Sequence, residues 1–484
     1  MRSRWPFLTR LWERVRVRGK FTMSLKAIVI GSGIGGSGLG ALLATRLGMD
    51  VELYERNAIL GGRYASYERE GFRLDVGCHA IGNSQRGTLG KILDEVGESV
   101  QWISTKTPVY FIGDRRYRFP KGVGEMGLDP EDVQKLFQLF TDITSMEESE
   151  LSRLDREDLQ SFLNRYTRDK RLQTIFAFIA GMYFCVPLNE TPVGEWAFCQ
   201  RELNRNLASG YPRGGTGAIP KAYCRAIEKA GGRVLRRREV RKILVEDGRA
   251  KGVVLDDGTV RKADLVVSNA DVKKTVLALV GPEHYEKHFI DRIRGLSWSY
   301  CCFTIKVALD RPVTQERFVV YIRDFDILEE EKRIRDGHLP EAIPSLMVPI
   351  VSNMDPTAAP DGKQILYAGT GCWPDLERMK ETHNQWTESC MNGLRRIYPD
   401  IDRHVLWVEA TGPEYIDGLF GEGGNVIGVA QTLDQVGEKR PPLIDPAVRN
   451  LYHCSADTGV HGIGGELAAD AALRLYDHLK GRYG

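Results

Sequence analysis

The sequence Lys26-Ala-Ile-Val-Ile-Gly-Ser-Gly-Ile-Gly-Gly36 decides the fold of this chain. Its first five residues predict a short buried strand, and the small residues of Gly38–Leu47 predict a helix directly after the glycines. Glycines in such a turn permit a tight bend, close approach of backbone to a pyrophosphate and close packing of the helix, whose N-terminus stabilises an anion. The glycines with this role are Gly31, Gly33, Gly35 and Gly36. The pattern therefore predicts a dinucleotide-binding turn.

An acidic residue at a suitable distance strengthens this prediction. Val51–Tyr54 predicts a second strand, and Glu55 stands at its end, nineteen residues after Gly36. A carboxylate in that place accepts hydrogen bonds from both ribose hydroxyls, whereas the alternative is a solvated charge at a strand end. Arg56 follows directly and is counted among the cofactor-binding residues. These elements predict the first βαβ unit of a doubly wound parallel sheet, so the expected fold class is α/β.

A second glycine pair, Gly61-Gly62-Arg63, follows shortly afterwards. It combines a backbone that a ligand can approach closely with a guanidinium suited to paired phosphate oxygens. By itself a Gly-Gly-Arg sequence is most often a loop. In this position it is typical of flavoproteins of the two-dinucleotide-binding class and not of plain NAD-binding folds. Gly62 and Arg63 therefore join the predicted cofactor site.

The composition argues against several classes of function. With 484 residues, 42% of them hydrophobic, the chain is long enough for two or three domains and a deep pocket. A net charge of +2 gives no reason to expect a nucleic-acid partner, because binding to a phosphate backbone needs a basic face. The nine cysteines are scattered without a Cys-x-x-Cys pair. We therefore predict no disulfide framework and no metal site, and we expect a reducing cytoplasm.

Positive charge is concentrated in residues 1–22, a basic N-terminal extension. Seven basic side chains stand there against a single acidic residue, Glu13. Trp5 and its apolar neighbours fit an interfacial anchor, but Met23 directly precedes the first strand, so the segment also fits a start codon placed too early. Both interpretations stay open. The uncharged run Ala27–Thr45 is not predicted to span a membrane, because its six glycines interrupt the apolar surface that a span needs.

The middle of the chain changes character twice. From about residue 128 to 205 the pattern is helical, and Thr174–Leu188 is almost entirely apolar but too short to cross a bilayer. That stretch predicts either a buried helix or one that dips into a membrane, and both could line an entrance for a lipophilic substrate. Arg233–Val245 and Gly252–Leu255 then alternate like strands of a meander, and Ala263–Ser268 predicts a further strand of the parallel sheet.

Several segments in the same order resemble the phytoene desaturase-like flavoproteins. That family includes carotenoid isomerases and retinol saturases and is distantly related to the flavin amine oxidases. The resemblance covers nearly the whole chain after residue 23. Besides the segments above, it rests on Tyr211-Pro-Arg-Gly-Gly-Thr-Gly217, Glu239-Val240, Asp256-Asp-Gly258, Ser268-Asn-Ala-Asp271, Asp355-Pro356, Leu451-Tyr452, Asp457 and Gly462-Ile-Gly-Gly465.

The resemblance implies FAD as the cofactor and a chain of two domains. It implies a two-dinucleotide-binding, Rossmann-like FAD domain with an inserted α+β substrate domain. The FAD domain is expected to be discontinuous and to comprise residues 23–105, 206–290 and 406–484. The substrate-binding domain is expected to comprise residues 106–205 and 291–405.

The resemblance also assigns roles along the cofactor. In the family, the residue at Val240 contacts the adenine, the residues around Asn269 lie along the cofactor, and the acidic residue at Asp457 meets its ribityl or phosphate end. The turn at Gly464-Gly465 places a helix N-terminus beneath the flavin ring. Such a terminus offers free N–H groups and positive dipole where reduced flavin is anionic.

Three side chains are candidates for the reacting end of the cofactor. His79 follows Arg63 by sixteen residues in a pattern similar to the retinol-saturase and isomerase branch, with a structurally hydrogen-bonded histidine as the alternative. His461 stands near where the desaturase pattern has proline and glycine, and it either faces the active site or is a surface or core histidine. Lys306 shares a strand face with Cys302 and Thr304. It either holds a water at flavin N5, as the similar strand of the amine oxidases suggests, or reaches solvent from a sheet edge.

Taken with the resemblance, these residues predict hydride transfer between flavin N5 and a C–C bond of a lipophilic, isoprenoid or polyene-like substrate, by a desaturase or a saturase. A flavin amine oxidase is the first alternative, favoured by Lys306. A non-redox FAD-dependent isomerase, or a binding protein that lost the flavin, is another. The electron acceptor is not predicted. We expect a cytoplasmic protein without a nucleic-acid partner, and contact with a membrane surface stays open.

Overall fold

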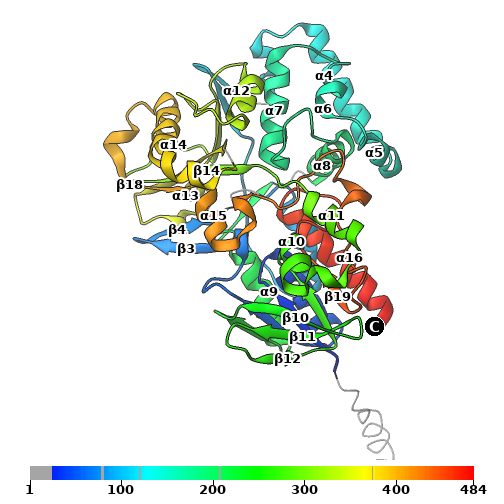
Figure 1. Cartoon of the computed structure of the whole chain (residues 1–484). Helices are drawn as coiled ribbons and strands as arrows, with labels where there is room; N and C mark the ends of the chain where they lie inside the picture. Colours follow the sequence, from blue (N-terminus) through cyan, green and yellow to red (C-terminus); the bar gives the residue numbers. More distant parts are fainter. Residues whose placement is uncertain (1–23, 78–80, 119–120, 207–208, 373) are drawn as a thin grey trace, which may run out of the picture.

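The computed structural model describes residues 24–77, 81–118, 121–206, 209–372 and 374–484. The region with the predicted nucleotide-binding turn fills the lower half of Figure 1, and a group of helices lies above it beside a large sheet. The basic N-terminal extension and His79 lie outside the described residues. Among the helices of the described ranges, none combines the length and the apolar character needed to cross a membrane.

The predicted parallel sheet is present, and it has five strands in the order β19-β13-β1-β2-β9. Each neighbouring pair is parallel. The strands are β1 Lys26–Ile30, β2 Asp50–Glu55, β9 Arg233–Arg236, β13 Leu265–Ser268 and β19 Leu451–His453. The sheet therefore unites the beginning, the middle and the end of the chain, and the predicted α/β fold class is confirmed.

The two faces of this sheet pack against different layers, because successive side chains of a strand point to opposite sides. Ala27 and Val29 of β1 pack on a helical layer, and Ile28 and Ile30 pack on a three-stranded meander. The helical layer contains α2 Ile34–Arg46, α3 Thr88–Glu95, α9 Ala218–Lys229 and α16 Gly465–Tyr483. The meander contains β10 Val240–Glu246, β11 Arg249–Leu255 and β12 Val260–Lys262. The prediction that the meander begins at Arg233 was wrong, since β9 extends the parallel sheet.

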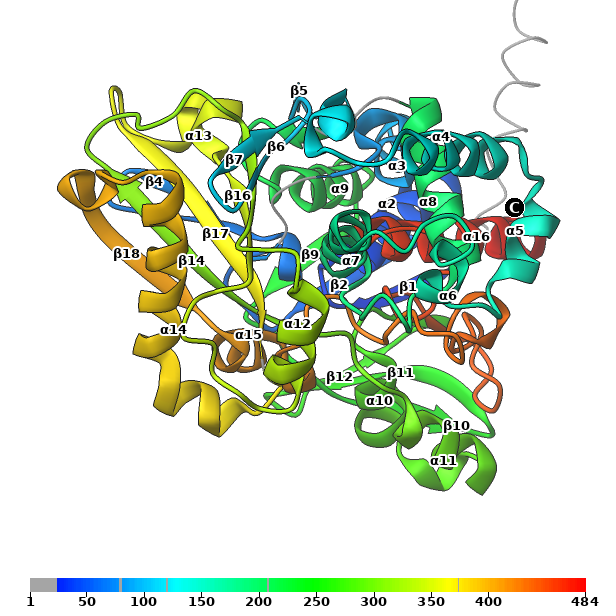
Figure 2. The same cartoon turned by 90° about the horizontal axis from the view of Figure 1, so that it is seen from above.

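A mixed sheet of seven strands forms the second region, in the order β18-β14-β17-β16-β15-β6-β7. Its strands are β6 Val109–Ile112, β7 Arg115–Tyr117, β14 Cys301–Leu309, β15 Phe318–Ile322, β16 Ser345–Pro349, β17 Gln364–Cys372 and β18 Val405–Thr411. The long helix α14 Leu376–Ile397 covers one face of this sheet (Figure 2). Its Trp386 packs on Phe303 of β14. The domain boundary predicted at residue 406 falls inside β18, which pairs with β14.

The helices between residues 130 and 206 form the group in the upper part of Figure 1. They are α4 Pro130–Ser145, α5 Glu148–Leu154, α6 Leu159–Leu163, α7 Lys170–Phe184 and α8 Val193–Asn206. Aspartates begin three of them: the side chains of Asp129, Asp158 and Asp169 accept backbone N–H groups in the first turns of α4, α6 and α7. Helix α7 corresponds to the apolar stretch of the sequence and packs within this group as a largely buried helix.

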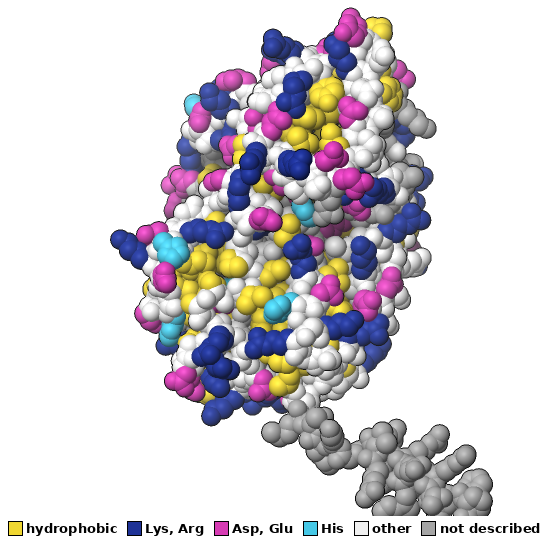
Figure 3. All heavy atoms as spheres, turned by 90° about the vertical axis from the view of Figure 1, so that its right-hand side faces the viewer, with side chains coloured by type: hydrophobic (Ala, Val, Ile, Leu, Met, Phe, Trp, Pro, Cys, Tyr) yellow, Lys and Arg dark blue, Asp and Glu magenta, His cyan; other side chains and the backbone are white. Residues whose placement is uncertain are grey.

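Shorter elements connect these regions. The strands are β3 Ser66–Arg69, β4 Phe72–Asp75, β5 Trp102–Ser104 and β8 Gly210–Pro212. The helices are α10 Val272–Lys274, α11 Lys287–Gly295, α12 Ile327–Arg335, α13 Val351–Met354 and α15 Pro413–Phe420. Figure 3 shows the face on the right-hand side of Figure 1, where acidic and basic side chains are interspersed with small hydrophobic groups.

The close packing of α2 gives a test of the fold. A Cβ atom on Gly35 would overlap the carbonyl oxygen of Cys454, whereas a Cβ on Gly481 of α16 would meet nothing within 4 Å. We expect Gly35→Ala to lower the free energy of unfolding by about 1–3 kcal/mol, as overpacking does, despite the higher helix propensity of alanine. Gly481→Ala is the control and should leave stability unchanged or slightly raised. Equal melting temperatures for both variants would contradict this account of the turn.

Candidate active site

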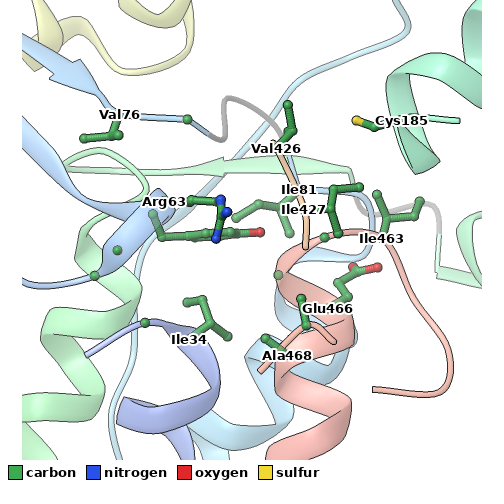
Figure 4. Close-up of a pocket in the computed structure, with 18 of the residues that line it drawn as sticks. Ile34, Arg63, Val76, Ile81, Cys185, Val426, Ile427, Ile463, Glu466 and Ala468 are labelled. Carbon is green, nitrogen blue, oxygen red and sulfur yellow. The ribbon is translucent and has the colours of Figure 1, made fainter. Parts of the chain in front are cut away.

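One large cavity of about 970 Å³ lies at the carboxyl ends of β1, β2 and β13 and continues between α7 and the seven-stranded sheet. Ligand pockets span roughly 300–1,000 Å³, so this cavity lies at the upper end of that range. Figure 4 shows its central part, with Arg63 on one side and Cys185, at the end of α7, on another. Ligands bind at this edge of doubly wound sheets, because the helices that follow the strands begin there.

The predicted glycine turn forms one wall of the cavity. Gly31 has a φ of +91°, and its N–H donates to the Tyr54 carbonyl at 2.8 Å. Gly33 is the N-cap of α2 and offers no side-chain cap, so the first N–H groups of the helix stay available for an anion. Gly31 and Gly33 line the cavity. Gly35 and Gly36 do not, because they pack against the backbone of Cys454 and Gly31.

Glu55 links the turn to the second glycine pair. Its Oε2 accepts hydrogen bonds from the N–H and hydroxyl of Ser32 at 2.9 and 2.7 Å, and its Oε1 accepts the Asn57 N–H at 2.8 Å. The Ser32 hydroxyl oxygen in turn accepts the Gly61 N–H at 3.0 Å. Glu55 is buried and lines the cavity. Ser32 was missed by the sequence analysis, although its place between the two glycines could have suggested it.

Arg56 and Arg63, the two basic residues predicted at the cofactor, both form hydrogen bonds to other residues of the protein. Arg56 lines the cavity and donates from Nη2 to the Leu419 carbonyl at 2.6 Å. Arg63 also lines it, but its Nη2 forms an ion pair with Glu422 at 2.7 Å and also donates to the Asn425 carbonyl. Burial alone would lower the pKa of Arg63, but the Glu422 carboxylate outweighs burial and raises it. Arg63 is therefore a fixed positive charge in the cavity wall.

Carboxyl groups surround this guanidinium. The Asp457 carboxylate accepts the N–H groups of Val272 and Val429 at 2.9 and 2.8 Å, and Asp457 lines the cavity. Its contact with the ribityl or phosphate end of the cofactor stays a prediction. Asp271 caps α10 by accepting the Lys274 N–H at 2.7 Å. Burial and the charges of Glu422 and Asp457 raise the pKa of Asp271 to about 8. Glu422 was not predicted to join this group, because it lies far from Arg63 along the chain.

The predicted helix N-terminus lies at the centre of the cavity. Gly464 is the N-cap of α16 with a φ of +55°, Gly465 begins the helix, and both line the cavity. A Cβ on Gly465 would overlap the Tyr64 ring, so the helix approaches closely because this position lacks a side chain. Glu466 also lines the cavity, and its carboxyl accepts the N–H and side-chain amide of Asn83 at 3.1 and 3.3 Å. Burial raises the pKa of Glu466, which favours the neutral carboxyl.

His461 does not line the cavity, so the proposed active-site role for it gains no support. Its Nδ1 lies 2.7 Å from Glu195 Oε2, and its ring stacks on Phe198 of α8 with centroids 4.4 Å apart. Burial would lower the pKa of His461, but Glu195 outweighs burial and raises it. Glu195 also accepts the Gly462 N–H at 2.8 Å. The pair therefore anchors the turn before α16 to α8.

Lys306 is also absent from the cavity lining, although Cys302 and Thr304, on the same face of β14, line it as expected. Its fully buried amine donates to the Tyr67 hydroxyl at 2.7 Å and lies 3.4 Å from Glu409. A buried amine needs such partners, because an unpaired charge away from water is costly. The geometry thus corrects the prediction that Lys306 faces the cofactor or, alternatively, solvent. The predicted role of His79 lies outside the described residues, and Val76 and Gly77 line the cavity.

The parts of the site match the parts of FAD. Uncapped N–H groups at α2 suit the pyrophosphate, Glu55 suits the ribose hydroxyls, and the uncapped start of α16 suits the flavin ring. Val240 and Asn269, which the resemblance places along the cofactor, also line the cavity. The residues present therefore fit this cofactor.

Comparison with known proteins decides the family. The sequence pattern of the flavin containing amine oxidoreductases matches residues 41–421. The chain belongs to the flavin containing amine oxidoreductase family. It is 24% identical to a zeta-carotene-forming phytoene desaturase of Myxococcus xanthus over 90% of each chain. It is 26% identical to prolycopene isomerase 2 of an Oncidium hybrid cultivar, over 90% of this chain and 81% of that protein.

A solved structure agrees in fold. An oxidoreductase from Methanosarcina mazei superimposes with a TM-score of 0.76 at 23% identity and covers 94% of this chain and 100% of its own. As a member of the flavin containing amine oxidoreductase family, the chain is an FAD-dependent oxidoreductase. The resemblance to phytoene desaturase-like proteins, the Rossmann-like fold and the FAD cofactor are thereby confirmed.

The hydrogen bonds of Glu55 predict an effect on cofactor affinity. Glu55→Ala removes the ribose acceptor and frees Ser32 from the turn, so we expect the Kd for FAD to rise at least tenfold, about 1.4 kcal/mol. Arg63→Ala should act in the same direction, because it leaves buried carboxylates without their positive partner. The visible flavin band after gel filtration measures retention. Glu95→Ala, at an exposed surface pair with Arg46, is the control. Full flavin retention in both site variants would refute the assignment.

Asp271 predicts a pH dependence of stability. An unfolded chain releases this proton near pH 3.9, whereas the folded chain holds it to about pH 8, so the folded state loses stability as pH rises between these values. Asp271→Asn keeps the cap and removes the titration. At each pH, the melting temperature of the unmodified protein is subtracted from that of Asp271→Asn. We expect this difference to be at least about 2 °C larger at pH 9 than at pH 5. An equal difference at both pH values would exclude the raised pKa.

Proposed function

We propose that this flavoprotein adds hydrogen to, or removes it from, a carbon–carbon bond of a lipophilic substrate of the isoprenoid or polyene type. FAD supplies the hydride chemistry when bound. The chain's own part is to hold the substrate beside the ring, to keep water away and to set the electrostatic environment. One observation carries the proposal: a single cavity runs from the cofactor-binding turns to a chamber with apolar walls.

The chamber takes its walls from three elements of the fold. Aromatic and aliphatic side chains of α4, α7 and the seven-stranded sheet meet there: Tyr110, Phe140, Ile179, Met182, Phe318 and Met347. Burying apolar surface stabilises a complex by roughly 25 cal/mol per Å², so a long hydrocarbon gains most from such walls. A charged amine would lose its hydration against these apolar side chains. The chamber therefore favours a lipophilic substrate.

The N-terminus of α16 determines which charge is stabilised in the part of the cavity proposed for the flavin ring. No side chain caps this helix, so the positive end of its dipole favours negative charge there. The raised pKa of Glu466 keeps an opposing carboxylate from forming, and Asn83 holds this group in place. Because the cofactor accepts or donates the hydride, the proposal needs no dedicated acid or base among the described side chains.

An exposed aromatic side chain marks an opening of the chamber. Phe137 of α4 is 62% exposed and yet lines the cavity, and Phe140 lies one turn further along the same helix. An apolar rim of this kind suits a substrate delivered from a lipid surface, and such contact is part of the proposal.

Two related activities compete with this function. Oxidation of an amine fits the family name, but Lys306, the residue that favoured it, is bound to Tyr67 and Glu409 away from the cavity lining. Isomerisation without net redox change fits the similarity to a prolycopene isomerase. A two-hydrogen difference between substrate and product separates isomerisation from the proposed reaction, and the class of compound that changes the flavin band separates amine oxidation from it.

The test is anaerobic mixing of the purified flavoprotein with polyenes, retinoids and amines, before and after reduction of the flavin. We expect a polyene or retinoid to change the flavin band and to yield a product that differs by two hydrogens in mass. Bleaching by amines alone would support an amine oxidase. A product of unchanged mass would support an isomerase.

A pair of isoleucines supplies a matched control for the chamber. Ile179→Gln places an amide in the apolar wall and should raise the apparent Kd for the active substrate about 10-fold or more, with the flavin retained. Ile444→Gln, at an exposed position outside the cavity lining, should leave it unchanged. Equal affinities in the two variants would show that the substrate binds elsewhere.

A further inference from the structure

A buried carboxylate of the helical group holds the turn before α16. Glu195 of α8 is fully buried, and its Oε1 accepts the Gly462 N–H at 2.8 Å. The side-chain amide of Gln431 donates to the same Oε1 and to the Gly462 carbonyl, in each case at 3.2 Å. Both backbone groups of Gly462, its N–H and its carbonyl, are therefore fixed by side chains from outside the turn.

The imidazole of His461 orients this carboxylate. Its Nδ1 lies 2.7 Å from Glu195 Oε2, so the other carboxylate oxygen is left to face Gly462. The imidazole is itself placed by Phe198, one turn after Glu195 in α8, because the two rings stack with centroids 4.4 Å apart and planes at 21°. A chain of contacts thus leads from His461 through Glu195 to the backbone of Gly462.

The position of Gly462 determines where α16 begins. Gly462 has a φ of +129°, and a Cβ atom there would lie 3.0 Å from both Glu466 Cβ and Leu467 N in the first turn of the helix. That distance is shorter than ordinary van der Waals contact, so the turn lies directly against the helix because glycine has no side chain. Figure 4 shows Ile463 and Glu466 beside the cavity at the beginning of α16. A shift of Gly462 would therefore move the N-terminus of α16 relative to the cavity.

We propose that His461 and Glu195 are positioning residues for the flavin, which hold the N-terminus of α16 at the ring and thereby raise the reduction potential of the bound cofactor. The proposal rests on the placement of the flavin ring at the start of α16. Neither residue is among the described residues that line the cavity, so both act through Gly462. The anionic reduced ring gains more from a helix N-terminus than the neutral oxidised ring does. Displacing this N-terminus therefore lowers the potential.

Three substitutions separate the hydrogen bond from the charge. His461→Ala removes the donor to Glu195, whereas His461→Asn keeps a neutral donor, because the amide nitrogen of asparagine takes the place of Nδ1. Gln431→Met releases the Gly462 carbonyl and leaves His461 unchanged. His383→Ala is the matched control, since His383 Nδ1 lies 2.9 Å from Glu414 Oε1 and neither residue is among the described residues that line the cavity.

The test measures the midpoint potential of the FAD-loaded protein by anaerobic reduction beside a dye of known potential. We expect His461→Ala to lower it by at least about 30 mV, the equivalent for a two-electron couple of tenfold weaker binding of reduced relative to oxidised FAD. Gln431→Met should lower it by at least about 15 mV, a threefold change on the same scale. His461→Asn and His383→Ala should stay within about 10 mV of the unmodified protein, a twofold change.

Three results would overturn the proposal. The first is an unchanged potential in His461→Ala, or in Gln431→Met should His461→Ala fail to fold. The second is an equal fall in His461→Asn, which would assign the effect to the charge of the imidazole and not to its hydrogen bond. The third is an equal fall in His383→Ala, which would assign it to a general loss of stability. No substrate enters the measurement, so its result is independent of whether the substrate assignment holds.

Discussion

The close approach of α2 to the end of the parallel sheet is the constraint on which the rest of the structure depends. Gly35 and Gly36 let the helix lie directly against the backbone of Cys454 and Gly31. This contact brings the beginning and the end of the chain together, so the N-termini of α2 and α16 face one cavity. Glu55 then holds the turn through Ser32. Without this packing, the N-terminus of α2, which suits the pyrophosphate, and the N-terminus of α16, which suits the flavin ring, would belong to separate clefts.

Charge in the cavity is controlled by burial as much as by residue type. Arg63 stays positive because Glu422 is beside it, whereas Asp271 and Glu466 are shifted toward their neutral forms by burial. Neutral carboxyls can line a site for a dinucleotide without repelling it. The same wall therefore accepts the anionic end of FAD in one place and leaves an apolar chamber in another.

The sequence predicted those parts of the site that depend on local pattern. The turn at Gly31, Glu55 at the end of β2 and the start of α16 at Gly465 all follow from short motifs whose backbone geometry is nearly fixed. Partners that lie far apart in sequence were not predictable. Strand alternation predicts which face of β14 carries Lys306, but it does not predict how far along that face the cavity extends. Lys306 was therefore expected at the cavity. Tyr67 and Glu409, which bind its amine, come from other strands.

The structure of the purified protein with its own cofactor, determined by crystallography, tests the central claim most directly. The account predicts FAD with its pyrophosphate at the N-terminus of α2, its ribose at Glu55 and its flavin ring beside Gly464, facing the chamber of Phe140 and Met182. A flavin ring away from Gly464, or a chamber separated from the flavin ring by protein, would contradict the account.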